Sequence, residues 1–110
     1  MQHDRRAQWL RAVLELCVLA LVRRRESYGY ELAAALEEAG LGAIKGGTLY
    51  PLLLRLERRG LITATWREGT VGPARKYYRI TPAGEVALRD AAAEWHAFRH
   101  GVDSILGKGR

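Results

Sequence analysis

The chain contains little cysteine and phenylalanine, and it has no long uninterrupted apolar run. One of its 110 residues is cysteine, Cys17, so an intramolecular disulfide is excluded and a reducing, cytoplasmic setting is expected. The most apolar stretch, residues 10–22, is interrupted by Arg11 and Glu15, so no membrane-spanning helix is expected. A secretory signal is not expected either, because no small-residue cleavage site follows that stretch.

Acidic residues are scarce in one segment only. The chain has 18 basic and 12 acidic residues, a net charge of +6, and charges balance within residues 1–44 and within residues 80–110. The whole excess lies in residues 45–79, where Glu57 and Glu68 are the only acids. The basic residues there are Lys45, Arg55, Arg58, Arg59, Arg67, Arg75, Lys76 and Arg79. An excess confined to one segment favours polyanion binding over a merely solvated basic face.

Patterns typical of catalysis and metal binding are missing. The sequence shows no paired carboxylates, no nucleophile with a base and no phosphate-binding glycine loop, so no enzyme activity and no cofactor are expected. His96 and His100 have the spacing of two metal ligands on one helix. Because no third ligand is evident nearby, we interpret them as surface histidines and expect no metal site.

Apolar periodicity predicts three helices in the first half of the chain, at residues 7–25, 28–39 and 47–59. Ser27 is the expected N-cap of the second helix, and Gly60 is expected to end the third. The first helix carries one apolar stripe, formed by Trp9, Val13, Leu16, Cys17, Ala20 and Leu21. Further apolar residues lie outside that stripe, so this helix needs a second partner surface, which we expect another subunit to supply.

The hydrophobic period changes after Gly60. Residues 61–66 and 75–80 are rich in β-branched and aromatic residues, and they predict a hairpin with its loop at residues 67–74. Thr81 followed by Pro82 is typical of a helix start and predicts a last helix over residues 82–106. The order predicts a mainly α fold with a two-stranded β wing. One domain, residues 1–110, would comprise a winged helix-turn-helix (7–81) and a C-terminal dimerisation helix (82–106).

The third helix has the pattern of a DNA-recognition helix. Its inward stripe is expected to be Leu49, Leu52, Leu53 and Leu56. The opposite face carries Thr48, Pro51, Leu54, Arg55 and Arg58, with Tyr50 on the flank. Arg55 is suited to a guanine edge, and Thr48 near the helix N-terminus is suited to phosphate. Leu54 either packs on a thymine methyl group or contacts another part of the protein. Arg67, Arg75 and Lys76 flank the hairpin loop, from which they can track a phosphate backbone or enter a minor groove.

Four strings of sequence together resemble the PadR family of regulators. They are Tyr-Gly-Tyr-Glu-Leu at 28–32, Gly-Thr-Leu-Tyr-Pro-Leu-Leu at 47–53, Leu-Glu-Arg-Arg-Gly-Leu-Ile at 56–62, and Gly-Pro-Ala-Arg-Lys-Tyr-Tyr-Arg-Ile-Thr at 72–81 followed by Gly84. The resemblance implies a bacterial repressor that dimerises through its first and last helices and binds a dyad-symmetric operator. It also implies DNA contacts by Tyr28, Thr48, Tyr50 and Lys76. Two residues depart from the family pattern: Leu54 replaces a polar or basic residue, and Lys45 replaces a capping serine.

The last helix carries a heptad seam, formed by Leu88, Ala91, Trp95, Phe98, Val102 and Ile105. Such a seam is expected where helices pack lengthwise on each other. We therefore expect a homodimer interface built from Trp9, Val13, Leu88, Trp95, Val102 and Ile105. The resemblance also implies a possible ligand site at Trp95 and Phe98, because some family members hold flat aromatic ligands at a tryptophan in a matching position. The simpler interpretation is that Trp95 is a packing residue of the dimer core.

Two functions remain in competition. The first is a DNA-binding transcriptional repressor, with contacts from Tyr28, Lys45, Thr48, Tyr50, Arg55, Arg58, Arg75 and Lys76. The second is a winged-helix module that binds protein. The basic excess on the third helix and the hairpin favours the first, because a protein-binding wing has no need to be uniformly cationic.

Overall fold

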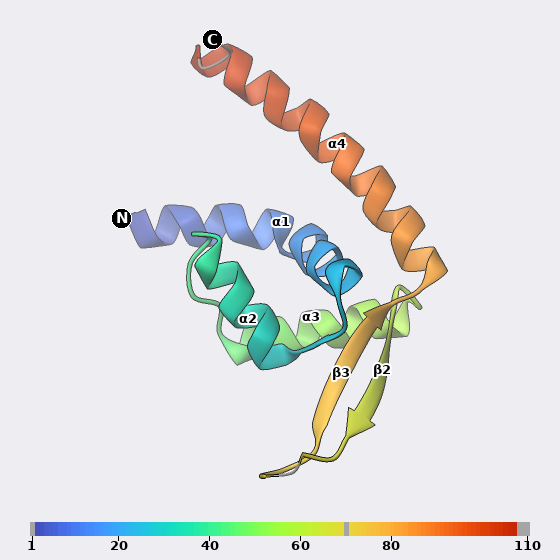
Figure 1. The fold of residues 1–110 in the computed structure, drawn as a ribbon. Coiled ribbons are helices and arrows are strands. Elements are labelled where there is room, and N and C mark those ends of the chain that lie inside the picture. Colours follow the sequence, from blue (N-terminus) through green and yellow to red (C-terminus); the bar gives the residue numbers. More distant parts are fainter. Residues whose placement is uncertain (1, 70, 108–110) are drawn as a thin grey trace.

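The computed structural model describes residues 2–69 and 71–107, and it consists of four helices and a small sheet. In chain order the elements are α1 (Gln2–Arg24), β1 (Ser27–Tyr28), α2 (Gly29–Glu38), α3 (Gly46–Arg58), β2 (Ile62–Arg67), β3 (Arg75–Ile80) and α4 (Pro82–Leu106). The β2–β3 hairpin projects from one side of the body formed by α1–α3, and α4 runs away from the other (Figure 1). The predicted mainly α fold with a β wing is confirmed. Within the described residues, no helix is long and apolar enough to cross a membrane.

The face of α1 that enters the core lies outside the stripe that contains Trp9 and Val13, the two α1 residues expected at the dimer interface. Leu10, Leu14 and Val18 are buried, whereas Trp9 is 63% exposed and Val13 is only partly buried. Because α1 is apolar around most of its circumference, periodicity alone does not select the core face. Packing against α2, β3 and α4 selects it. Cys17 is half-buried, and burial raises the pKa of its thiol, as is typical of an unreactive cysteine.

A two-residue strand adds to the predicted hairpin. β1 pairs antiparallel with β3, Ser27 opposite Tyr78, and the sheet order is β1-β3-β2. Ser27 is therefore not the N-cap of α2, as expected from sequence, because strand pairing places it one residue too early. Its hydroxyl donates to the carbonyl of Arg25 at 3.1 Å. Tyr28 is the N-cap, and its N–H donates to the Glu31 carboxylate at 3.3 Å.

The junction between hairpin and α4 is tightly fixed. The Thr81 hydroxyl accepts the N–H of Gly84 at 3.0 Å and donates to the carbonyl of Gly60 at 2.6 Å, which confirms the predicted helix start. Gly60 has φ +75°, the left-handed conformation expected at the end of α3. Gly84 is buried against the chain of Leu61, where a Cβ atom would collide with the Leu61 carbonyl oxygen. These contacts hold the hairpin at a set position beside α3.

Candidate nucleic-acid interface

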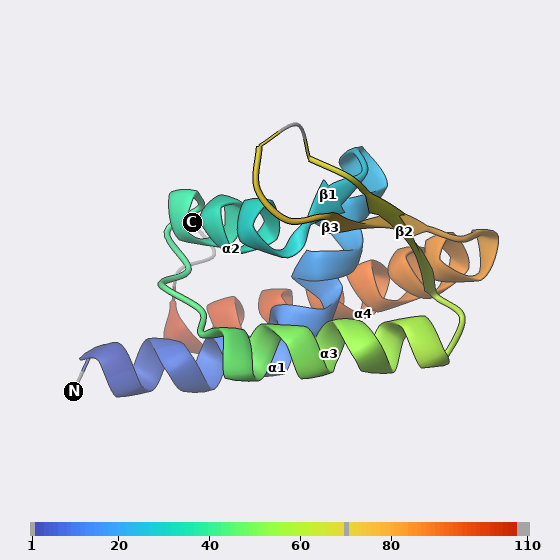
Figure 2. The same ribbon diagram turned by 90° about the horizontal axis from the view of Figure 1, so that it is seen from below.

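The third helix presents a polar and basic face to solvent. Its four inward leucines are buried. The opposite face is exposed throughout: Thr48, Pro51, Leu54, Arg55 and Arg58. Viewed from below, α3 and the hairpin lie on the same side of the molecule, with α4 behind them (Figure 2). The two elements that carry the basic excess are therefore placed to meet one polyanion together.

The start of α3 shows how the helix begins without a capping serine. Lys45 is the N-cap, with extended backbone angles, and its side chain makes no capping hydrogen bond. Its carbonyl oxygen accepts the N–H groups of Thr48 and Leu49, both at 2.9 Å. Lys45 and Thr48 are exposed at the positive end of the helix dipole, an arrangement that favours an anion there.

Two arginines of the hairpin lie over tyrosine rings. The Arg75 guanidinium is 4.5 Å from the ring centre of Tyr28, and the Arg67 guanidinium is 4.3 Å from that of Tyr77. The two rings meet edge to face at 5.2 Å. Arg67 also forms an ion pair with Glu26. These contacts leave Tyr28 partly buried between hairpin and α2, and they fix the directions of both arginines.

Lys76 is paired within the chain, which the sequence did not indicate. Its ammonium lies 3.1 Å from Glu57 Oε1 of α3, with the side chains 29% and 32% exposed. The ammonium also lies 5.9 Å from the ring centre of Trp66 and 5.7 Å from that of Tyr78. Among the described residues no group has hydrogen-bond geometry toward the buried Glu57 Oε1, so the contact is an ion pair. It ties the recognition helix to the wing.

A hollow of about 450 Å³ separates α3 from the hairpin. Leu54 and Tyr50 line it from α3, and Trp66 lines it from β2. Tyr50 packs over Gly29, where a Cβ atom would collide with the tyrosine hydroxyl. Leu54 therefore borders this hollow, while 42% of it stays exposed.

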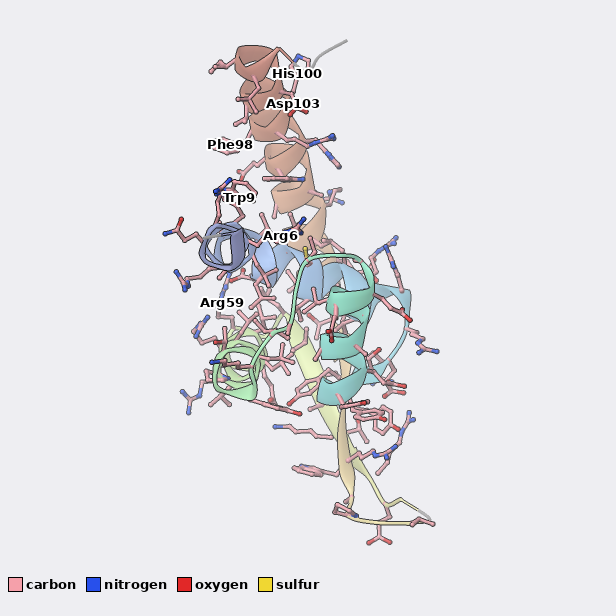
Figure 3. The ribbon with its side chains drawn as sticks, turned by 90° about the vertical axis from the view of Figure 1, so that its left-hand side faces the viewer. Arg6, Trp9, Arg59, Phe98, His100 and Asp103 are labelled. Atoms are coloured by element: carbon pink, nitrogen blue, oxygen red, sulfur yellow. The ribbon has the colours of Figure 1, made fainter. Side chains whose placement is uncertain are left out.

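A separate apolar surface runs along α1 and α4. Its exposed members are Trp9 (63%), Phe98 (67%), Val102 (40%) and Ile105 (86%). In Figure 3 Trp9 projects from α1 toward α4, and Phe98 projects from the same flank of α4. Leu88, expected at the dimer interface, instead lies in the chain's own core at 9% exposure. The part of the heptad seam that is open to a partner therefore begins after Leu88, where α4 runs away from α1–α3.

Trp95 and Phe98 are neighbours on that surface. Their ring centres are 6.5 Å apart and the rings are tilted by 34°. His96 and His100 are exposed on the same helix. Within the described residues no group of three or more His, Cys, Asp or Glu side chains could hold a metal ion.

Sequence reasoning missed the partners that neutralise part of the basic segment. Arg59 belongs to that segment by count, yet it forms an ion pair with Glu15 of α1 at 3.0 Å.

Trp66, opposite Lys76 in the hairpin register, was not selected as a functional residue. The available signal was strand alternation, which places Trp66 on the same face of the hairpin as Lys76 and Tyr78.

Comparisons with known proteins agree on one family. Residues 18–90 match the model of the transcriptional regulator PadR-like family. The transcriptional regulator Rv3488 of Mycobacterium tuberculosis is 39% identical over 83 residues, 76% of each chain. A PadR-like transcriptional regulator from Bacillus cereus has a TM-score of 0.81 at 38% identity, covering 90% of this chain and 96% of its own. One from Eggerthella lenta has a TM-score of 0.81 at 39% identity, covering 91% and 87%.

Proposed function

Since the chain belongs to the PadR-like family of transcriptional regulators, a family of regulators and not of enzymes, we propose that it is a repressor that binds a palindromic operator as a homodimer. The observation that carries the proposal is the location of the charge. The net charge of +6 resides in residues 45–79, which contain α3 and the hairpin, and these two elements share one side of the molecule. A duplex is the partner that such a surface fits.

We assign the contacts to two classes. Arg55 on the exposed face of α3 reads a base edge, because a guanidinium can bind guanine through two hydrogen bonds. The second class positions the protein on the DNA backbone. It comprises Tyr28 at the start of α2, Lys45, Thr48, Tyr50 and Arg58 of α3 and its N-cap, and Arg75 and Lys76 of the hairpin. Lys76 contacts the backbone in competition with Glu57.

The test is selection of bound fragments from the source genome, followed by a salt titration on the selected duplex. We expect one palindrome to be enriched and its binding to weaken steeply as salt rises. Replacing Arg55 should relax sequence preference, whereas replacing Arg58 should weaken binding to all duplexes alike. Equal weak binding to every duplex would refute the specific regulator and favour the protein-binding winged helix.

The dimer rests on the exposed apolar surface of α1 and α4. Trp9, Val102 and Ile105 leave large apolar side chains in water, and a second copy would bury them. In such a dimer the two recognition helices should lie about 34–36 Å apart, one turn of B-DNA. A dimer with an incompatible separation would contradict binding to one palindrome.

We also propose that a small aromatic effector binds at the dimer interface. Trp95 and Phe98, with ring centres 6.5 Å apart, offer flat surfaces on the side where the second copy would lie. A planar aromatic molecule between them would alter how the two α4 helices pack, and thereby the spacing of the recognition helices. Quenching of Trp95 fluorescence by such a molecule, lost in Phe98→Ala, would support it.

A further inference from the structure

Leu54 is the one leucine of α3 that the core does not use. Leu49, Leu52, Leu53 and Leu56 are buried, with at most 3% of each exposed, whereas 42% of Leu54 is exposed. Each residue of a helix advances by about 100°, which places Leu54 on the side opposite those four leucines. It therefore lies on the face that α3 offers to a partner.

Leu54 and Pro51 form an apolar step on a face that is otherwise polar. Pro51 lies three residues before Leu54 and is also exposed, so the two side chains are neighbours on the helix surface. Arg55 follows directly and Arg58 lies one turn later, both exposed. Among the described residues neither of these guanidinium groups forms an ion pair. A partner that fits this face must therefore present hydrogen-bond acceptors and an apolar group side by side.

The hollow beside α3 accounts for only part of the Leu54 side chain. Leu54 lines that hollow together with Tyr50 of the same helix and Trp66 of β2. Tyr50 and Trp66 are themselves 52% and 66% exposed, so they do not close over Leu54. The exposed part of Leu54 is therefore available to a molecule that α3 meets.

The major groove of a duplex presents one prominent apolar group, the C5 methyl group of thymine. The groups that distinguish the other bases there are hydrogen-bond donors and acceptors, with which a leucine side chain cannot pair. An arginine, in contrast, is suited to the two acceptors of guanine. A helix face that places leucine next to arginine therefore fits a thymine close to a guanine.

We propose that Leu54 is a specificity-determining residue that reads the methyl group of a thymine in the major groove. This role rests on the proposed function, in which Arg55 of the same helix reads a guanine. Consecutive residues rise about 1.5 Å along a helix, which is less than the ~3.4 Å between stacked base pairs. The thymine should therefore lie on a base pair adjacent to that guanine.

The test uses the full chain and the palindromic duplex selected from the source genome. Each thymine of one half-site is replaced in turn by deoxyuridine, which lacks the C5 methyl group and keeps the same hydrogen-bonding groups. We expect one position to weaken binding of the wild type about fourfold, as for loss of a contact worth about 0.8 kcal/mol. The same replacement should leave binding of Leu54→Ala unchanged. The absence of such a position, or an equal loss in Leu54→Ala, would overturn the proposal.

Two further variants separate this role from general effects on binding. Val86→Ala is the matched control, because it shortens an apolar side chain of similar exposure, 46%, on α4. Its response to deoxyuridine should equal that of the wild type. Arg55→Gln should lose the response to 7-deazaguanine, which lacks the N7 acceptor, and keep the response to deoxyuridine. A sensitive thymine more than one base pair from the sensitive guanine would refute the proposal.

Failure of the proposed function would give a different result. If no duplex is enriched in the selection, the chain is not a sequence-specific regulator, and Leu54 has no base to read. If one palindrome is enriched but no effect of deoxyuridine depends on Leu54, the regulator is supported and Leu54 serves only as a wall of the hollow.

Discussion

Replacing Glu57 with glutamine removes the carboxylate that lies 3.1 Å from the Lys76 ammonium. The variant keeps the size and polarity of the side chain, so the packing of α3 on the wing should persist. It changes the local charge from neutral to +1 on the side of the molecule where the recognition helix and the hairpin lie. We expect Glu57→Gln to bind every duplex more tightly than the wild type does.

The size of the effect follows from the ion pair. In the wild-type protein a phosphate group that approaches Lys76 competes with Glu57, and pairs of this exposure are worth up to ~1 kcal/mol. That energy corresponds to about fivefold in a binding constant, the upper limit for the gain. A lysine that newly neutralises one phosphate should steepen the slope of log K against log salt by ~0.9.

The assay is fluorescence anisotropy of a labelled duplex over a series of salt concentrations. Lys76→Gln should weaken binding to all sequences, because it leaves Glu57 unpaired beside the duplex. Glu57→Gln combined with Lys76→Gln restores local neutrality and should bind nearly as the wild type does. Glu15→Gln is the matched control, since it frees Arg59, which faces α1, and should leave the salt slope unchanged.

One result would refute this reasoning. If Glu57→Gln is folded, as judged by circular dichroism, yet binds no more tightly and with the same salt slope, Glu57 does not withhold Lys76 from phosphate. The ion pair would then have only a structural role in joining α3 to the wing.

Three further predictions concern stability and assembly. Gly84→Ala should lower the free energy of unfolding by about 1–3 kcal/mol, because its methyl group would meet a backbone carbonyl. Gly47→Ala should not lower it, because the space around the Cβ position is open. Urea denaturation of both variants measures the difference. Burial, and to a lesser degree a nearby carboxylate, raises the pKa of Tyr78. Unfolding should therefore become easier as pH rises above about 10, and Tyr78→Phe should show a smaller fall in stability. Ile105→Asp should weaken self-association at least tenfold in sedimentation experiments. Burial of an isoleucine in the dimer contributes about 1.5–3 kcal/mol to the free energy of association. His100→Asp, on another face of α4, should have little effect.

The recognition helix and the wing could be predicted because their signals are local and periodic. The leucines of α3 recur at helical spacing, so their burial follows once the helix forms. The change to strand alternation after Gly60 located the hairpin, and Thr81 with Pro82 set the start of α4 to the residue. The charge excess in residues 45–79 needed only counting.

The features that the sequence left open all depend on contacts between distant segments. The sequence did not select the core face of α1, because the helix is apolar around most of its surface, and only its neighbours distinguish Leu10 from Trp9. The pairing of β1 with β3 joins residues about fifty positions apart, so no local pattern reveals it. Leu88 belongs to the heptad seam by spacing, yet α4 is still in contact with the body at that turn.

For the candidate site, too, some properties follow from the sequence alone and others only from the tertiary structure. By itself the sequence determined which residues are cationic and that they belong to one recognition helix and one wing. Only the tertiary structure decided that Arg59 is neutralised by Glu15 and Lys76 by Glu57, and that Leu54 and Trp66 border one hollow. The physical reason is that charge type and period are properties of the chain, whereas the partner of a charge and the walls of a cavity are set by which segments the fold brings together.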